Sequence, residues 1–259
     1  MSSAIVTGAY GAIGSAICQG LVDKGYDLTL VGRDEARLMN LQQKLETRAA
    51  GGRVDYHVVD LSLKASIVSF ACSRNKPLDL LINNAATGPR RRTESAEGVE
   101  MQWAVNVLSY FRMIHYFKDH MINRPDARIV NVASYWAGGL DLSDPEFRKR
   151  PYDNDVAYRQ AKQADRMMTV AWAGRLKDSN ITVNACHPGD VNSKLSNSFG
   201  FSGHETPAEG AATPLFLAID ERIKGLTGKY FEHLQEVRCS FSSDHKAVEA
   251  LFNELARSL

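Results

Sequence analysis

The sequence has no long apolar run and no strong excess of charge of either sign. Of its 259 residues, 31 are Lys or Arg and 30 are Asp or Glu, so the formal net charge is only +1. Because basic and acidic residues are almost equal in number, there is no electrostatic reason to expect nucleic acid as a partner. No stretch approaches the ~18 apolar residues that a membrane span needs. We therefore expect neither a nucleic-acid partner nor a membrane anchor.

Cysteine is also scarce, and its four positions are scattered. Cys18, Cys72, Cys186 and Cys239 form no CxxC pair and no metal-ligand spacing. We expect reduced thiols, two or three of them in the core, and no metal site. The first residues lack a basic start followed by an apolar run, so they do not resemble a secretory signal. A cytoplasmic protein is the resulting expectation.

Short β-branched runs alternate with longer amphipathic stretches along the whole chain. Because strands separated by helices form right-handed crossovers, this alternation predicts an α/β, doubly wound, single-domain fold with about seven mostly parallel strands and helices on both faces. Irregular loops near residues 135–157 and 190–207 follow predicted strand ends, where such sheets bind ligands. Strands are predicted at residues 4–6, 28–31, 54–59, 78–82, 129–132, 181–185 and 228–231. The long helices are predicted at about 99–121 and 155–176.

A glycine-rich segment, TGAYGAIG at residues 7–14, lies between the first predicted strand and the first predicted helix. Glycine at such a turn lets backbone amides approach a pyrophosphate, and the helix N-terminus favours its negative charge. We therefore predict a dinucleotide-binding (Rossmann) domain over residues 1–259; an ordinary strand-to-helix turn is the alternative. The loop residues expected to contact the cofactor are Gly8, Tyr10, Gly11, Ala12, Ile13 and Gly14.

The residues after the second predicted strand distinguish between the two nicotinamide dinucleotides. An acidic residue there would bind the adenosine ribose and favour NAD. This chain has Arg33 followed by Asp34. The planar guanidinium of Arg33 suits a 2′-phosphate, whereas Asp34 could bind the ribose but is also a good helix N-cap. We predict NADP(H), with NAD(H) as the alternative.

Two further strand ends are expected to complete the cofactor-binding groove. Asp60, which Leu61 follows, ends the third predicted strand and could accept a hydrogen bond from the adenine amine. The small residues of the NNAA segment at 83–86 would let the backbone lie against the adenosine half. Each segment alone could be a simple turn. The residues predicted to line the groove here are Asp60, Leu61, Asn84, Ala85 and Ala86.

Tyr158 and Lys162 lie four residues apart on a predicted helix, so they share one face. A tyrosine of pKa ~10 exchanges protons poorly at neutral pH. A nearby ammonium favours the phenolate and lowers that pKa. Such a pair alone has no functional meaning in most proteins. Its combination with the glycine-rich segment favours an interpretation as a proton-transferring pair.

Two polar residues are expected to join this pair. Ser134 follows the fifth predicted strand, where its hydroxyl would point into the ligand crevice and could polarise a carbonyl oxygen. Asn106 lies inside a predicted helix, where asparagine has poor propensity. It could hold a water that relays protons from Lys162; a core polar group satisfied locally is the alternative.

These segments together resemble the short-chain dehydrogenase/reductase family. Its TGxxxGxG, NNAG, Asn, Ser, YxxxK and PG elements appear in family order across nearly the whole chain. The resemblance implies that Tyr158 acts as general acid in reduction and general base in oxidation. It implies that Lys162 lowers the tyrosine pKa and holds the nicotinamide ribose. Ser134 would position the substrate oxygen and Asn106 would hold the water.

The resemblance also extends to the nicotinamide end and to one branch of the family. Pro188 and Gly189 would border the nicotinamide, with Val191 and Ser193 on its carboxamide side. The chain is most similar to the retinol-dehydrogenase-like and WW-domain-oxidoreductase-like branch. The similarity rests on TESAEGVE at 93–100, the long insertion between residues 134 and 158, VNACHPG at 183–189 and GKYF at 228–231. That branch generally uses the Arg after the second strand for NADP.

Several positions depart from the family pattern. Ala12 occupies the middle glycine position, with Gly11 one residue early, so the loop should turn by a slightly different path. Ala86 replaces the glycine of NNAG, and Ser193 replaces the usual Thr but keeps its hydroxyl. Ala133 replaces the first Ser of a common pair, which leaves the catalytic second Ser in place. No chemical group that the mechanism requires is missing.

We therefore expect an NADP-dependent oxidoreductase that interconverts an alcohol and a ketone or aldehyde. The alternatives are a catalytically silent NADP-binding sensor or scaffold, and a double-bond reductase of the enoyl or pterin type. Trp136, Tyr152 and Phe199 could line a pocket for an apolar small-molecule substrate. The basic run at 90–92 is interpreted as a solvated loop. Whether the chain forms a homo-oligomer stays open.

Overall fold

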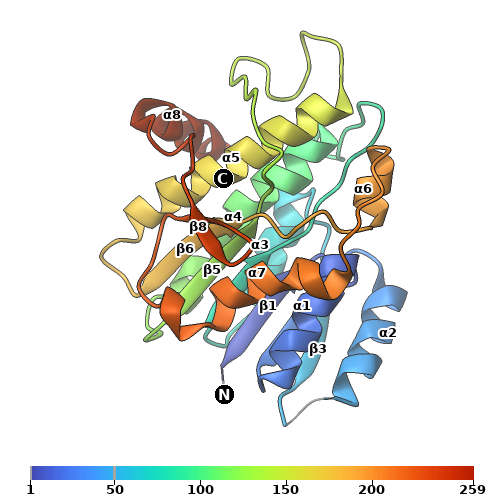
Figure 1. Ribbon diagram of the computed structural model, residues 1–259, viewed down its shortest axis with the longest axis vertical. Coiled ribbons are helices and arrows are strands. Elements are labelled where there is room, and N and C mark those ends of the chain that lie inside the picture. Colours follow the sequence, from blue (N-terminus) through green and yellow to red (C-terminus); the bar gives the residue numbers. More distant parts are fainter. Residues whose placement is uncertain (1, 49–50) are drawn as a thin grey trace.

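An eight-stranded, mostly parallel sheet lies between two layers of helices in the computed structural model, which describes residues 2–48 and 51–259 (Figure 1). The strand order across the sheet is β3-β2-β1-β4-β5-β6-β7-β8. The strands are β1 Ser3–Thr7, β2 Asp27–Gly32, β3 Val54–Val58, β4 Leu80–Asn83, β5 Ala127–Val132, β6 Ile181–Cys186, β7 Tyr230–Glu232 and β8 Gln235–Val237. The α-helices are α1 Ala12–Asp23, α2 Glu35–Glu46, α3 Lys64–Ser73, α4 Ser109–Met121, α5 Asn154–Arg175, α6 Lys194–Ser198, α7 Pro207–Ile219 and α8 His245–Ala256. The predicted doubly wound α/β fold is confirmed.

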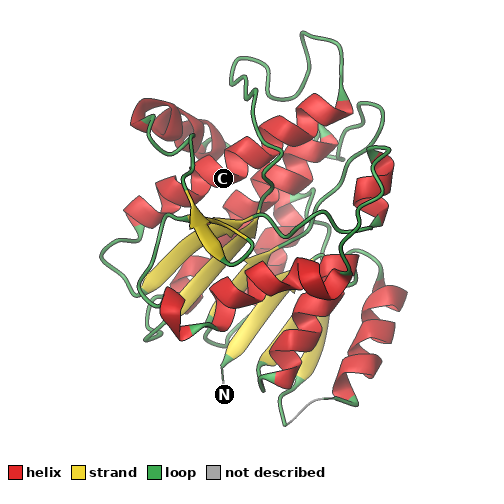
Figure 2. Ribbon diagram, viewed as in Figure 1, coloured by secondary structure: helices red, strands yellow, loops and turns green. Residues whose placement is uncertain are grey.

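The central strands β1, β4 and β5 are buried along nearly their whole length because helices cover both faces of the sheet, as Figure 2 shows. In β1, Ala4 and Val6 pack in one core with side chains of α1, α2 and α7. The residue between them, Ile5, packs in the opposite core with α3, α4, α5 and α8, the last of which contributes Leu251. Alternate residues of one strand therefore serve two cores, which explains why the strands read as continuous apolar runs.

The order of strands reverses between β1 and β4. β1 pairs in parallel with β2 on one side and with β4 on the other, with Val6 opposite Leu30 and Ile82. In open parallel sheets, ligands bind in the crevice outside the carboxyl ends of the strands at such a reversal. Thr7 and Asn83 end the two strands that meet there.

Some elements are not among those predicted from the sequence. β8 pairs antiparallel with β7 and adds one strand to the seven predicted. The helices α3, α6 and α7 are also additions, and α6 has no buried residue, so it lacks the apolar spacing that reveals a helix. The helix predicted at 99–121 begins at residue 101 and contains a π-helical segment, η1 Trp103–Leu108. There the N–H of Ser109 bonds the carbonyl of Ala104, one residue further back than in an α-helix.

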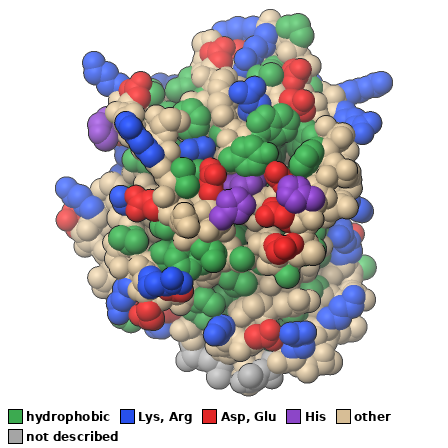
Figure 3. Space-filling model, viewed as in Figure 1, with side chains coloured by type: hydrophobic (Ala, Val, Ile, Leu, Met, Phe, Trp, Pro, Cys, Tyr) green, Lys and Arg blue, Asp and Glu red, His purple; other side chains and the backbone are tan. Residues whose placement is uncertain are grey.

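Neither the charge on the surface drawn in Figure 3 nor the apolar content of the described helices is extreme. On the face drawn in Figure 3, basic and acidic side chains are interspersed. Within residues 2–48 and 51–259, no helix is both long and apolar enough to cross a bilayer.

Candidate active site

Two adjoining cavities lie at the carboxyl ends of the strands. The larger, of about 600 Å³, we call the groove, and the smaller, of about 260 Å³, the aromatic pocket. They are continuous, because the same residues line both: Ile13, Asn84, Ala86, Ser193 and Leu195. Every site residue predicted from the sequence lines one cavity or the other, except Asn106 and Tyr152. The hydroxyl of Tyr152 instead donates to the carbonyl of Pro89 at 3.1 Å and accepts from the amide of Gln102 at 2.9 Å, so its predicted place in the pocket is wrong.

The glycine-rich segment folds tightly at the start of α1. Gly8 has a φ of 64°, and a Cβ there would lie 2.8 Å from the Cα of Ala85. Glycine is therefore needed both for the backbone angle and for the close approach. The N–H of Gly11 donates to the carbonyl of Gly8 at 2.9 Å, and α1 begins at the next residue, Ala12. The loop therefore enters its helix through a four-residue turn from Gly8 to Gly11.

Thr7 and Asn84 tie the ends of β1 and β4 together beneath this loop. The Thr7 hydroxyl oxygen accepts hydrogen bonds from the backbone N–H groups of Asn84 at 2.9 Å and Ala85 at 3.1 Å. The Asn84 amide donates in return to the carbonyl of Thr7 at 2.9 Å. With Asn84 engaged in this way, Ala85 and Ala86 present only small side chains to the groove.

Two arginines stand where β2 meets the groove. Arg33 is exposed, and its backbone N–H donates to the hydroxyl of Tyr10 at 3.2 Å. The guanidinium of Arg37 lies 4.2 Å from the centre of the Tyr10 ring and donates to the Tyr10 carbonyl at 3.0 Å. Asp34 accepts from the backbone N–H of Arg37 at 3.1 Å as the N-cap of α2. The carboxylate therefore has the capping role weighed in the sequence analysis, and both guanidinium groups border the groove.

The end of β3 supplies another wall of the groove. One carboxyl oxygen of Asp60 accepts from the N–H of Ser62 at 2.9 Å and from its hydroxyl at 2.6 Å. Asp60 thus holds the turn that precedes α3. Leu61 lies beside it, nearly buried, and both residues line the groove.

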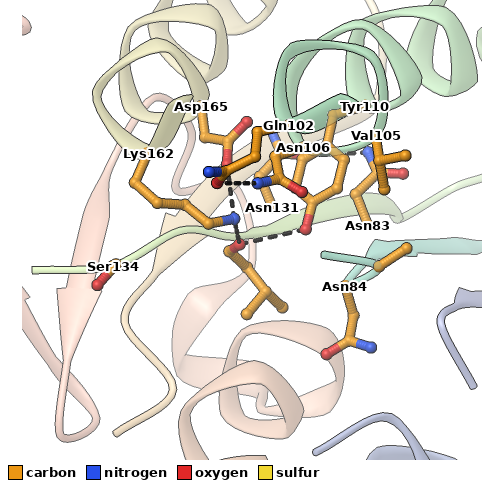
Figure 4. Close-up of polar contacts among 12 residues, drawn as sticks. Asn83, Asn84, Gln102, Val105, Asn106, Tyr110, Asn131, Ser134, Lys162 and Asp165 are labelled. Atoms are coloured by element: carbon orange, nitrogen blue, oxygen red, sulfur yellow. Dashed lines mark hydrogen bonds and ion pairs between the residues drawn. The ribbon is translucent and has the colours of Figure 1, made fainter. Parts of the chain in front are cut away.

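Lys162 of α5 lines the aromatic pocket. Figure 4 shows its side chain beside Asp165 and Tyr110. Lys162 is only 1% exposed, and its ammonium donates to the carbonyl of Val132 and to Oδ2 of Asp165, each at 2.9 Å. The hydroxyl of Tyr110 donates to the same Val132 carbonyl at 3.3 Å. The Lys162 ammonium lies 5.7 Å from the centre of the Tyr158 ring. The structure therefore brings Tyr158 and Lys162 together, as their spacing predicts.

Tyr158 lines the aromatic pocket, and two aromatic side chains surround it. Its ring centre lies 4.8 Å from that of Phe199 and 5.9 Å from that of Trp136. Burial raises the pKa of Tyr158, and the opposing effects of the Lys162 ammonium and the Ser134 hydroxyl do not outweigh it. The sequence leads us to expect a lowered pKa. The main cause of the difference is burial of the tyrosine, and the Asp165 and Asp190 carboxylates add to it by offsetting part of the effect of the ammonium on the pKa.

Ser134 follows β5 and is almost buried beside the same pocket. Its hydroxyl oxygen accepts from the N–H of Trp136 at 3.0 Å. A serine hydroxyl has one proton and two lone pairs. This bond therefore leaves the proton available to a second partner in the pocket.

Asn106 lies in η1, fully buried and outside both cavities. Its oxygen accepts from the N–H of Thr87 at 2.8 Å, and its amide nitrogen donates to the Thr87 carbonyl at 2.9 Å and to Gln102 at 3.4 Å. Figure 4 shows the amide turned toward Gln102. Both amide protons are in use, which matches the alternative of a locally satisfied polar group, while the relay-water role stays a prediction. Asn106 fixes the segment after β4 that borders the groove.

The segment after β6 forms the remaining wall of the pocket. Gly189 has a φ of 109°, and a Cβ there would collide with the carboxylate of Glu205. Val191 forms a β-bridge with Glu205, and Ser193 caps α6 by accepting from the N–H of Ser196 at 3.1 Å. Pro188, Gly189, Val191 and Ser193 therefore line the pocket together, where the resemblance locates them.

Several lining residues, Arg37 and Phe201 among them, are not identified by the sequence analysis, and three others contact residues of the site or line both cavities. Leu195 of α6 lines both cavities, and Asp190 lines the pocket while accepting from the hydroxyl of Tyr135 at 3.3 Å. Asp165 is the third, through its contact with Lys162. Only Asp165 has a recognisable signal, since it follows Lys162 by three residues and must share its helix face.

Known proteins share both the sequence pattern and the length of this chain. A family model described as short chain dehydrogenase matches residues 2–200. A probable oxidoreductase of Streptomyces antibioticus is 36% identical over 256 residues, which cover 91% of this chain and 86% of that protein. Retinol dehydrogenase 13 of Mus musculus is 30% identical over 274 residues, covering 98% of this chain and 82% of that protein.

Solved structures share the fold. An uncharacterized protein from Mycobacterium paratuberculosis superposes with a TM-score of 0.83 at 24% identity, over 99% of this chain and 94% of that one. L-Sorbose reductase from Gluconobacter frateurii, complexed with NADPH and L-sorbose, gives a TM-score of 0.69 at 23% identity, over 89% and 94%. Together with the family match, these findings show that the chain belongs to the short-chain dehydrogenase/reductase family, in its retinol-dehydrogenase-like branch, and is an oxidoreductase of that family.

Proposed function

We propose that the chain is an NADP(H)-dependent oxidoreductase that interconverts an alcohol and a ketone or aldehyde by hydride transfer. The observation that carries the proposal is the position of Tyr158 and Ser134, which line a pocket continuous with the groove. The Lys162 ammonium lies 5.7 Å from the centre of the Tyr158 ring. Two hydroxyl groups and a cation thus lie beside the groove that we assign to a dinucleotide.

The residues of the groove fit a nicotinamide dinucleotide. A Cβ at Gly8 or Gly14 would collide with the backbone of Ala85 or of Gly8, so glycine lets the loop pack tightly at the start of α1, where backbone amides and the helix N-terminus suit a pyrophosphate. Asp60 and Leu61 would hold the adenine, and the small residues of the 84–86 segment would border the adenosine. Lys162 would hold the nicotinamide ribose, and the 188–193 segment would border the nicotinamide. When bound, the cofactor supplies or accepts the hydride.

The cationic end of the groove supports NADP over NAD. Arg33, Asp34 and Arg37 all line this end, but one carboxyl oxygen of Asp34 caps α2, and the two guanidinium groups outnumber the one carboxylate. A guanidinium binds a phosphate through paired, charge-assisted hydrogen bonds. The NADPH held by L-sorbose reductase, a protein of the same fold, is in keeping with this preference.

The side chains of the pocket would supply the proton chemistry. In reduction, the Ser134 hydroxyl would donate a hydrogen bond to the carbonyl oxygen, and Tyr158 would give its proton to that oxygen as the C–O bond gains negative charge. In oxidation, the Tyr158 phenolate would accept the proton of the alcohol. Lys162 would favour the phenolate by its charge.

The walls of the pocket favour an apolar carbonyl compound or alcohol. Trp136, Phe199 and Phe201 line it with Val191 and Leu195. Aromatic and aliphatic walls with a few convergent polar groups are typical of small-molecule sites. Retinol dehydrogenase 13 has an apolar alcohol in its name, which supports the same class of substrate.

Replacement of Gly14 by Ala is expected to weaken NADPH binding at least about tenfold, or about 1.4 kcal/mol. The added Cβ would overlap the carbonyl oxygen of Gly8 and lie 2.9 Å from Nδ2 of Asn84, so the loop would have to move. The measurement is a titration of NADPH fluorescence. Gly174→Ala is the matched control, because a Cβ in that part of α5 meets nothing within 4 Å. Equal affinities in the two variants would contradict the assignment of the loop.

Transfer of deuterium tests the proposed function itself. The purified chain is incubated with NADPH deuterated at C4 of the nicotinamide and with apolar ketones and aldehydes of graded size. We expect deuterium on the carbinol carbon of an alcohol product. If NADPH binds but no compound of the panel receives deuterium, the chain is a dinucleotide-binding protein without carbonyl chemistry, and the proposal fails.

A further inference from the structure

A carboxylate is buried beside the lysine of the proposed site. Asp165 follows Lys162 by one helical turn on α5, and the two side chains are 0% and 2% exposed. Oδ2 of Asp165 lies 2.9 Å from the lysine Nζ. The other oxygen, Oδ1, has no hydrogen-bond partner in the part of the chain that the structure describes. Figure 4 shows the lysine reaching between this carboxylate and the strand β5. Among the described residues, the carboxylate therefore has its one hydrogen bond with Lys162.

We propose that Asp165 is a positioning residue, which holds the Lys162 ammonium in place and sets the pH at which Tyr158 exchanges its proton. The inference rests on the proposed function in that it takes Tyr158 as the proton-transferring group. It adds a residue that touches neither cavity and acts on the tyrosine through the lysine.

Charge cancellation within the pair is the first step of the argument. Burial alone would lower the pKa of Lys162, but the Asp165 carboxylate, with contributions from Tyr110 and Tyr158, raises that pKa above the usual lysine value. The ammonium therefore stays charged in a buried site, where an unpaired lysine would lose its proton. Burial raises the pKa of Asp165 itself to about 7, although the Lys162 ammonium opposes that rise. Above that pH, where a tyrosine ionises, the carboxylate is charged and reduces the positive potential at Tyr158. A tyrosine beside such a pair keeps a higher pKa than one beside a lone ammonium.

The other ionisable groups around the pair come from neighbouring elements. Tyr110 of α4 and Cys186 of β6 face the ammonium, and burial raises the pKa of each, so both stay neutral at pH 7. His187, after β6, is also neutral there, because burial lowers its pKa to about 4. Asp190 is a second carboxylate that raises the pKa of Tyr158. Unlike Asp165, its side chain is 27% exposed, so solvent screens it more.

The geometry also explains how Lys162 is oriented. Its Nζ has three protons, of which one goes to Asp165 and one to the Val132 carbonyl. These two bonds fix the direction of the third, and they hold the ammonium near both Tyr110 and Tyr158. Loss of the carboxylate would therefore change both the net charge of the pair and the direction in which the Lys162 ammonium points.

Asp165→Asn removes the charge and keeps an oxygen for Lys162. We expect the midpoint of the Tyr158 titration to fall by roughly one pH unit, because the ammonium is no longer offset. In alcohol oxidation, where Tyr158 must be ionised, the rising limb of the pH profile moves to lower pH. In carbonyl reduction, where Tyr158 must hold its proton, the falling limb moves in the same direction. A residue that only supports packing would change rate or stability without moving either limb.

The experiment uses the full chain and two independent measurements. The first is NMR of protein labelled with carbon-13 at the oxygen-bearing tyrosine carbon, where Tyr158→Phe assigns the signal. The second is the pH profile of kcat for alcohol oxidation with NADP. Asp178→Asn, an exposed residue after α5, is the control for removal of one acidic charge. Asp165→Ser is a second charge-removing variant, in case the asparagine disturbs folding.

A lower NMR midpoint in a folded Asp165 variant, with Asp178→Asn unchanged, supports the inference. It does so even if no substrate is turned over, in which case only the proposed function fails. Turnover with unchanged midpoints in both measurements would overturn the inference and leave the proposed function standing. Failure of both Asp165 variants to fold would also overturn it, because Asp165 would then be a structural residue.

Discussion

Replacement of Tyr158 by Phe is expected to lower kcat by about 10³-fold or more, while the affinity for NADPH changes by less than about threefold. The change removes one oxygen and keeps the ring that packs against Phe199 and Trp136. No other group in the pocket combines a transferable proton with a neighbouring buried ammonium. Initial rates with the best substrate of the deuterium panel and a fluorescence titration of NADPH measure the two quantities.

A matched tyrosine elsewhere provides the control for this variant. Tyr56 lies on β3, with its hydroxyl near Glu35, and borders neither cavity. Tyr56→Phe removes the same oxygen and should leave kcat at the parent value. Turnover of Tyr158→Phe within a factor of about three of the parent would rule out Tyr158 as the proton donor.

Replacement of Arg33 by Ala is expected to weaken NADPH binding by about 10- to 100-fold and to change NADH binding by less than about twofold. A hydrogen bond to a charged group contributes about 1.5–3 kcal/mol, and each 1.4 kcal/mol is a factor of ten in affinity. The 2′-phosphate is the only part that distinguishes the two cofactors. The ratio of the two dissociation constants, measured by fluorescence titration, is therefore the decisive quantity.

The control for Arg33→Ala is another exposed arginine near the same helix. Arg48 follows α2 at its far end and pairs with Asp23, and Arg48→Ala removes the same charge. We expect it to preserve the preference for NADPH. If Arg33→Ala also preserves it, a different residue recognises the phosphate, and Arg37 becomes the next to replace because its guanidinium borders the groove.

The features that could be predicted from the sequence depend on local geometry. The turn from Gly8 to Gly11, the capping of α2 by Asp34 and the shared helix face of Tyr158 and Lys162 each involve residues within four positions of one another. Backbone sterics and helix periodicity decide such features wherever the chain is placed. The alternation of strands and helices was sufficient to predict β1 to β7 but not the antiparallel β8.

The features that could not be predicted depend on contacts between distant segments. Asn106 bonds the backbone of Thr87, so its role is decided by how η1 packs against the end of β4. The pKa of Tyr158 depends on burial and on which charges remain unpaired, and the sequence alone does not show that Asp165 is buried. Likewise, α6 reaches the groove without burying an apolar face.

The packing of α8 on α5 has a consequence for the order in which the protein becomes functional during synthesis. Phe252 of α8 lies against Trp172 of α5 and Phe111 of α4, with ring centres 5.2 Å and 5.0 Å apart. The helix that carries Tyr158 and Lys162 is therefore anchored by residues that leave the ribosome long after it. Contacts of such long sequence separation form slowly, because a large loop must close first. A nascent chain that stops before residue 245 therefore carries Tyr158 and Lys162 on a helix that already packs on η1 and β6 but still lacks its aromatic contact with α8.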